Sequence, residues 1–241
     1  DTVQDMRIGI VGSVLRGLYP AVDLTAAPAE TCNWSHGGVA LGVPAPSGLD
    51  DSDGAAPIDR VVRSMTGTDW QLLILATPLS EGAIARQRDL LLNEMRVVMA
   101  AAKNEAAPSP LTEQYVELLK IALTTAGEGM ATGAWRTAIY LLGDQYSYPR
   151  LASAWRSVMS GPKSLPEPVR SFDTQSAGEL ARLWALPDTE GAPAPGRYRR
   201  PFEYQTLLST VQLAAALHLP ELETPGFTVN LAPRFDVVPP P

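Results

Sequence analysis

The chain has 241 residues, of which 45% are hydrophobic, and it carries a formal net charge of −7 at pH 7. This acidic balance argues against a surface that binds nucleic acid by neutralising many phosphates with clustered lysine and arginine. No apolar run approaches the ~20 residues needed to cross a bilayer, and no signal peptide is visible at the start of the sequence. The one cysteine, Cys32, excludes an internal disulfide and makes the cytoplasm the default location.

Proline placement divides the chain. Of the 22 prolines, 16 gather in four stretches that mark connections: residues 44–57, 162–168, 187–201 and 220–241. We therefore expect three segments, namely a helix and loop-rich segment (1–56), an α/β core (57–186), and a loop, short helix, strand and proline-rich exit (187–241).

The first elements follow from apolar spacing. A helix is expected to end near Tyr19–Pro20, and Gly38–Val43 is a short apolar piece within a loop-rich region. Residues 58–65 have the apolar spacing of a helix that Gly67 can stop. The continuous apolar run Trp70–Ala76 has the length of a strand, and we expect it to be buried on both faces.

Two long helices should follow this strand. From Ser80, an apolar stripe at helical spacing predicts an amphipathic helix; its members are Ile84, Leu91, Met95, Val98 and Ala102. Ser109 as N-cap and Pro110 at the first position predict the start of the next helix, and Gly127 its end.

A second strand is expected at Trp135–Leu142, with a helix after it that stops at Gly161–Pro162. Three residues of the first unit recur 65 positions later, because Met65, Trp70 and Ile74 correspond to Met130, Trp135 and Ile139. Both units have the order helix, glycine turn, strand, helix, which favours a sheet covered by crossover helices. We therefore predict a helix-rich α/β protein with a mixed sheet built from two strand–helix units.

The last third should add a strand at Val169–Phe172 and a helix at Ala177–Leu186. Ser209 and Gln212 have the spacing of a capping box, and Leu208 and Leu213 that of a hydrophobic staple, so a short helix should begin there. An alternating strand, 227–231, and three final prolines, 239–241, then suggest a strand that leads into a stiff linker.

No pattern in the sequence supports catalysis. The phosphate-binding motif GxxxxGK[ST] is absent, and its nearest likeness, Ser160–Ser164, contains a proline between glycine and lysine, as in a helix stop. Gly9, Gly12 and Gly17 lack the spacing of a dinucleotide-binding loop. Asp50, Asp51 and Asp53 begin like a calcium loop but lack its turn glycine and closing glutamate, so we interpret them as a solvated loop.

Cys32 and His36 have a spacing that occurs in metal sites, but zinc needs three or four ligands and His218 is far away in sequence. The same pair could act as a thiolate and base, although a loop cysteine and a solvent-exposed histidine are the simpler interpretation. We therefore predict no catalytic, cofactor-binding or metal-binding residue.

One cluster combines basic and aromatic side chains: Arg197, Tyr198, Arg199 and Arg200. It could contact a phosphate or an acidic partner, or it could supply the solubilising charges of a linker.

Several stretches resemble a known family, among them Gln205–Phe227 (QTLLSTVQLAAALHLPELETPGF) followed by RFDVVPPP. Together with WQLLILATPL, LLLNEMRVV and GAWRTAIYLLGD, they are similar to the region before the nucleotide-binding motor in HerA/FtsK-type P-loop ATPases, a group that includes conjugation and secretion ATPases. The likeness covers most of residues 57–241.

The resemblance implies a ring-forming, usually hexameric motor that moves DNA or protein, in which the amino-terminal part helps to assemble the ring or dock partners. This chain lacks the Walker motifs, so no catalytic residue is transferred, and ATP and magnesium are expected only in a motor domain beyond Pro241. Expected partners are proteins or further copies of the chain, with nucleic acid reached only through the motor. A free-standing interaction domain and an enzyme with an unrecognised site are the alternatives.

Overall fold

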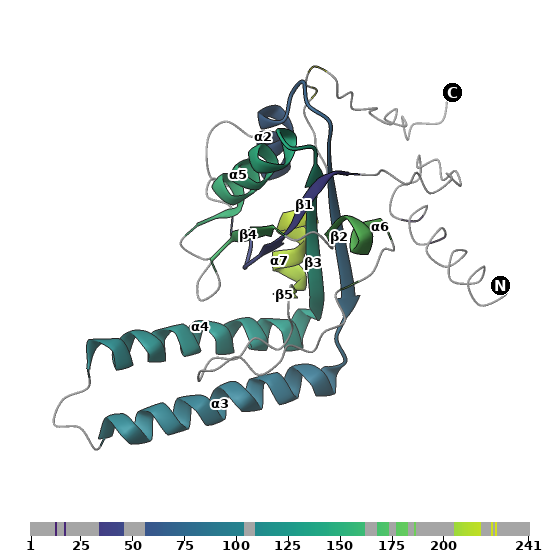
Figure 1. The fold of residues 1–241 in the computed structure, drawn as a ribbon. Coiled ribbons are helices and arrows are strands. Elements are labelled where there is room, and N and C mark those ends of the chain that lie inside the picture. Colours follow the sequence, from purple (N-terminus) through teal and green to yellow (C-terminus); the bar gives the residue numbers. More distant parts are fainter. Residues whose placement is uncertain are drawn as a thin grey trace, which may run out of the picture. The chain divides into compact units, whose positions relative to one another are not determined.

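The computed structural model describes residues 34–45, 56–103, 109–161, 168–173, 177–182 and 205–217, and the single positions 13, 17, 186, 223 and 225. Residues 32–227 form one compact unit, and the following description concerns that unit alone. Its elements are β1 (His36–Leu41), α2 (Pro57–Ser64), β2 (Trp70–Pro78), α3 (Glu81–Lys103), α4 (Pro110–Thr132), β3 (Ala134–Gly143), α5 (Ser147–Met159), β4 (Arg170–Asp173), α6 (Ala177–Arg182), β5 (Thr206–Ser209) and α7 (Thr210–Leu217). The predicted α/β class is confirmed (Figure 1).

Strand β3 is the centre of the five-stranded sheet. One of its edges pairs with β2 along nearly its whole length, from Trp70 opposite Gly143 to Pro78 opposite Trp135. The other edge is shared, because β1 pairs with residues 139–143 and β5 with residues 134–137. β4 then pairs with the free edge of β1. The sheet thus takes strands from all three of the segments that the proline pattern separates.

The pairings among the described strands are all antiparallel, where we expected a mixed sheet. The reason lies between β2 and β3. Two helices, α3 and α4, carry the chain out and back, so it returns to the end of β2 that it left, and the Leu79 amide donates to the Ala134 carbonyl at 2.9 Å. A single crossover helix would have returned the chain to the opposite end of the sheet and made the pair parallel.

The 65-residue offset does not mark two equivalent units. Ile74 and Ile139 are direct partners on neighbouring antiparallel strands. Met65, just after α2, is buried, whereas Met130 lies in the last turns of α4 and is exposed. The likeness between these positions is therefore a coincidence of apolar residues.

Alternation along the central strand builds two apolar layers. On one face, Ile139 and Leu141 contact the buried sides of α2 and α5, including Trp155. On the other face, Tyr140 and Leu142 lie in a second cluster with Ala177 and Ala181 of α6. Figure 1 shows α2 and α5 on one side of the sheet and α6 on the other. Burial raises the pKa of the Tyr140 hydroxyl to about 12.

Local capping signals are confirmed. Ser109 Oγ accepts the Thr112 amide at 3.2 Å at the start of α4. Ser209 and Gln212 exchange hydrogen bonds of 2.9 and 3.3 Å, as a capping box requires, and the expected staple, Leu208 with Leu213, packs in one cluster.

The predicted end of α4 at Gly127 is wrong, because the helix continues to Thr132. It ends at Gly133, whose φ of 95° is a conformation that favours glycine. Of the helix predicted to end near Tyr19–Pro20, only positions 13 and 17 are described, and both are helical; the strand at 227–231 and the final prolines lie outside the described residues. Within the described part of the chain, no helix has both the length and the apolar character needed to span a membrane.

A close approach between α5 and the sheet yields the first prediction. The Tyr148 hydroxyl donates to the Asp173 carboxylate and lies directly over Gly38. A Cβ at Gly38 would lie 2.2 Å from that hydroxyl oxygen and 2.4 Å from the Phe172 carbonyl oxygen. We expect Gly38→Ala to lower the free energy of unfolding by about 2 kcal/mol or more, measured by urea denaturation.

The control is Gly127→Ala, in the interior of α4, where an added Cβ meets nothing within 4 Å. Because alanine has the higher helix propensity, this variant should gain roughly 0.5–1 kcal/mol. A Gly38→Ala protein as stable as the parent chain would contradict the described packing of Tyr148.

Candidate interaction surface

Several of the candidate residues lie outside the described part of the chain: Arg197, Tyr198, Arg199, Arg200, Cys32, His218, Asp50, Asp51, Asp53, Gly9 and Gly12. The contact predicted for the basic-aromatic cluster therefore stays a prediction, as does the role of Cys32. Within the described ranges, no three histidine, cysteine, aspartate or glutamate side chains gather as a metal ion would require.

His36 lies at the exposed start of β1, with Nδ1 3.0 Å from the Ser35 hydroxyl and its backbone opposite Gly143. The nearby carboxylate, Asp144, serves the backbone. It accepts the amides of Ser147 at 2.7 Å and Tyr146 at 2.8 Å, while its own amide donates to Ser147 Oγ. This arrangement caps the start of α5.

These hydrogen bonds to the charged form lower the pKa of Asp144, first through the Ser147 amide and then through the Tyr146 amide; His36 adds a smaller effect of the same sign. We interpret the Asp144 group as a structural cap.

Two other candidate features are also structural. α5 ends at Met159, and the Ser160 amide donates to the Arg156 carbonyl at 3.2 Å, so the Ser160–Gly161 pair is a helix stop as predicted. Trp155 is fully buried in the core, and Trp135 is partly buried with its Nε1 donating to Thr210 Oγ1 at 2.9 Å. The tryptophans of the described residues are therefore packing residues.

Beyond its base, where α4 contacts β5 and α7, the hairpin of α3 and α4 has no packing partner among the described residues. Each helix has 23 residues, which makes it about 35 Å long. The two lie side by side and leave the sheet at one end of β2 and β3 (Figure 1). They contact each other through a cluster of their own, in which Leu91, Val98, Leu119, Ala122 and Ala126 are buried. Tyr115 Oη donates to Glu94 Oε1 at 3.2 Å and fixes the alignment of the helices.

One flank of this hairpin is apolar. Leu90 and Val97 each precede a residue of α3 that is buried against α4, and they are 64% and 56% exposed. On α4, Leu118 and Ile121 likewise precede the buried Leu119 and Ala122. In two antiparallel right-handed helices, positions one residue before the buried ones lie on the same side of the pair.

Leu111, seven residues before Leu118, extends this surface toward the tip and is 78% exposed. We call Leu90, Val97, Leu111, Leu118 and Ile121 the apolar flank. Isolated exposed leucines are common, but a contiguous apolar patch on a monomer marks a contact site.

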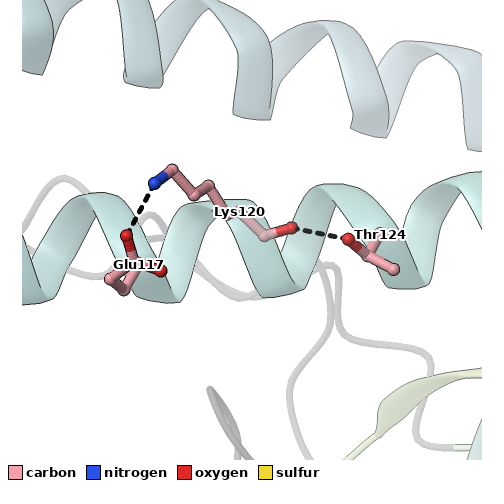
Figure 2. A network of polar contacts seen from close by, with 3 residues as sticks. All are labelled: Glu117, Lys120 and Thr124. Atoms are coloured by element: carbon pink, nitrogen blue, oxygen red, sulfur yellow. Dashed lines mark hydrogen bonds and ion pairs between the residues drawn. The ribbon is translucent and has the colours of Figure 1, made fainter.

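Another part of the exposed surface of α4 is polar. Lys120 Nζ lies 2.6 Å from Glu117 Oε1, and the Thr124 hydroxyl donates to the Lys120 carbonyl at 3.0 Å (Figure 2). By helical spacing Lys120 lies away from the apolar flank, whereas Glu117 and Thr124, four residues before and three after Ile121, border it. The surface of α4 around Lys120 therefore differs from the apolar flank in being polar.

The sequence prediction did not identify the apolar flank. It assigned the buried stripe of α3 correctly, since Ile84, Leu91 and Val98 are buried. The signal was present in the heptad spacing of Leu90 with Val97 and of Leu111 with Leu118, but such a count has meaning only once α3 and α4 are known to pair.

Comparison of the chain with models of known families, with curated proteins and with solved structures finds no match.

The Asp144 cap yields a prediction on pH. A carboxyl whose pKa is lowered by folding stabilises the protein above its unfolded pKa, and this contribution is lost as the pH falls through the folded value. Asp144→Asn keeps an acceptor but removes the charge. The loss of thermal stability that it causes should therefore be larger at about pH 6 than at about pH 3.

Thermal unfolding followed by circular dichroism at both pH values would measure this difference. Asp89→Asn, on the exposed surface of α3, controls for the removal of one negative charge. An effect of Asp144→Asn that is the same at both pH values would contradict the assigned role of the carboxylate.

Proposed function

We propose that this chain is a non-catalytic assembly or docking domain of a ring-forming ATPase that translocates DNA or protein, and that the α3–α4 hairpin is its contact surface. The observation that carries the proposal is the apolar flank, which exposes leucine and valine on a rigid pair of helices. The carboxylate of Asp144, near His36, has a structural role as the cap of α5.

The position of the hairpin suits a docking element. Both of its helices are joined directly to paired strands, and the Leu79–Ala134 hydrogen bond closes its base. A partner bound along the apolar flank would therefore be held rigidly relative to β2 and β3. Binding surfaces on fixed helices lose less conformational entropy on association than surfaces on loops.

The resemblance to HerA/FtsK-type ATPases supplies the class of machine. In this proposal, ATP and magnesium are bound by a motor domain outside these 241 residues, and nucleic acid is reached through that motor in the cytoplasm. The net charge of −7 agrees with a domain whose own contacts are to protein. A free-standing interaction domain would use the same surface without a motor.

The test uses the natural gene product. We expect the gene to encode GxxxxGK[ST] after Pro241, and we expect the complete protein to form an ATP-dependent ring, measured by native mass spectrometry with and without ATP. Leu90→Glu with Val97→Glu should reduce ring formation by roughly tenfold or more, because charges would enter an apolar contact.

Met99→Glu is the matched control. Met99 is exposed on the same helix, but it follows the buried Val98 and so lies on the opposite flank. Ring formation that is equally impaired by Met99→Glu would contradict the assigned surface. ATP turnover by the 241-residue chain alone would contradict a non-catalytic role.

A further inference from the structure

We propose that the partner of the apolar flank is a second copy of this chain, and that two hairpins pair flank to flank as a two-fold four-helix bundle. This inference rests on the proposed function in so far as both use the hairpin as the contact surface. It adds the identity and the geometry of the partner.

The distribution of charge along the flank favours burial. In a two-helix coiled coil, the positions that border the buried seam are usually charged and stay in water. Here the bordering positions are Ala83, Leu90 and Val97 on α3 and Leu111, Leu118 and Thr125 on α4, and none of them is ionisable. The hairpin therefore has the composition of half of a four-helix bundle on this side.

Two two-fold axes are possible between the flanks, and they differ in which helices meet. An axis parallel to the long axis of the hairpin brings α3 of one copy over α4 of the other, with the two running antiparallel. Each helix then has antiparallel neighbours, as in an up-down bundle, and the sheets of both copies lie at the same end.

The charges of the two helices agree with this pairing. α3 carries four basic and three acidic side chains, whereas α4 carries one basic and three acidic side chains. Pairing α3 with α4 of a second copy therefore brings a net positive helix against a net negative one, twice. The alternative rotation would place like-charged helices together. A foreign partner of uniform charge would be complementary to only one of the two helices.

The available area is sufficient for a dimer. A face about 35 Å long and ~20 Å wide, the breadth of two packed helices, offers roughly 700 Å² per copy. Stable interfaces bury about 800 Å² per partner, so this surface lies at the lower end of the standard range. We therefore expect a reversible dimer with a dissociation constant in the micromolar range.

The alignment of the helices predicts a specific intermolecular neighbour. The Tyr115–Glu94 hydrogen bond places Leu90 at the level of Leu118 and Ile121. In the two-fold pair, Leu90 of one copy therefore lies opposite Leu118 and Ile121 of the other.

The first experiment is sedimentation equilibrium of the complete 241-residue chain. We expect a dimer whose dissociation constant rises about 100-fold in the Leu90→Glu, Val97→Glu double variant, at roughly tenfold for each charge. Met99→Glu should leave the constant within about twofold. Because all three positions are exposed, unchanged far-UV circular dichroism would show that the variants keep their fold.

The second experiment tests the geometry by disulfide formation in a chain with Cys32→Ser. A mixture of Leu90→Cys and Ile121→Cys chains should form a mixed disulfide in clearly higher yield than Met99→Cys mixed with Ile121→Cys. Equal yields in the two mixtures would overturn the two-fold arrangement.

Self-pairing would be overturned by a chain that stays monomeric at all concentrations. It would also be overturned by a dimer whose dissociation constant is the same in the double variant as in the parent chain. If the double variant nevertheless blocked ATP-dependent ring formation by the complete gene product, the proposed function would stand with a different partner. If self-pairing were observed and no motor followed Pro241, this inference would stand and the ATPase assignment would fail.

Discussion

The antiparallel pairing of β2 with β3 is the constraint on which the rest of the structure depends. It places the last residue of β2 opposite Trp135, so that the chain must leave and re-enter the sheet at neighbouring points. Two helices of equal length satisfy this condition, and Gly133 turns the returning helix into the strand. The hairpin is thus an insertion at the tip of a β-hairpin. The start of α3 and the end of α4 lie beside each other because they follow and precede paired strands. The buried cluster between the two helices then keeps them side by side.

The second edge of β3 ties distant parts of the sequence together. β1 and β5 lie end to end along it, and the Gly42 amide donates to Thr206 Oγ1 at 3.0 Å where one strand gives way to the other. At this junction the chain leaves the sheet, and Gly42 has a φ of 107° with the Pro168 carbonyl close by. Gly42 and Thr206, which are 164 positions apart in the sequence, are therefore hydrogen-bonded at the point where β1 and β5 meet along β3. The sheet cannot form fully from the central segment alone, even though that segment contains its longest strands.

Local elements could be predicted from the sequence, whereas their return path could not. Ser109 and the Ser209–Gln212 pair act within one helical turn, so their spacing alone determines the hydrogen bonds. Both helices between β2 and β3 were predicted, but the direction of β3 depends on their lying side by side, which returns the chain to the same end of β2, and the length of α4 depends on Gly127 being tolerated inside it. Glycine weakens a helix by only about 1 kcal/mol, which the packing of the neighbouring Ala126 can offset. β5 is only four residues long, and it is a strand only because it pairs with the edge of β3, so no local pattern predicts it.

The apolar flank could not be predicted from local sequence either. A residue next to a buried one can be assigned to a contact surface only once the pairing of α3 with α4 shows on which side of the hairpin it lies. The position of the apolar flank also limits how the hairpin can associate. The opposite surface of α4 carries charged groups such as Lys120, which would stay hydrated at little cost. Copies that used two different surfaces would leave part of the flank in water and could add further copies without end. Flank-to-flank pairing buries the flank of both copies at once and closes at two copies, so assembly of such dimers into a ring requires a second, different contact surface.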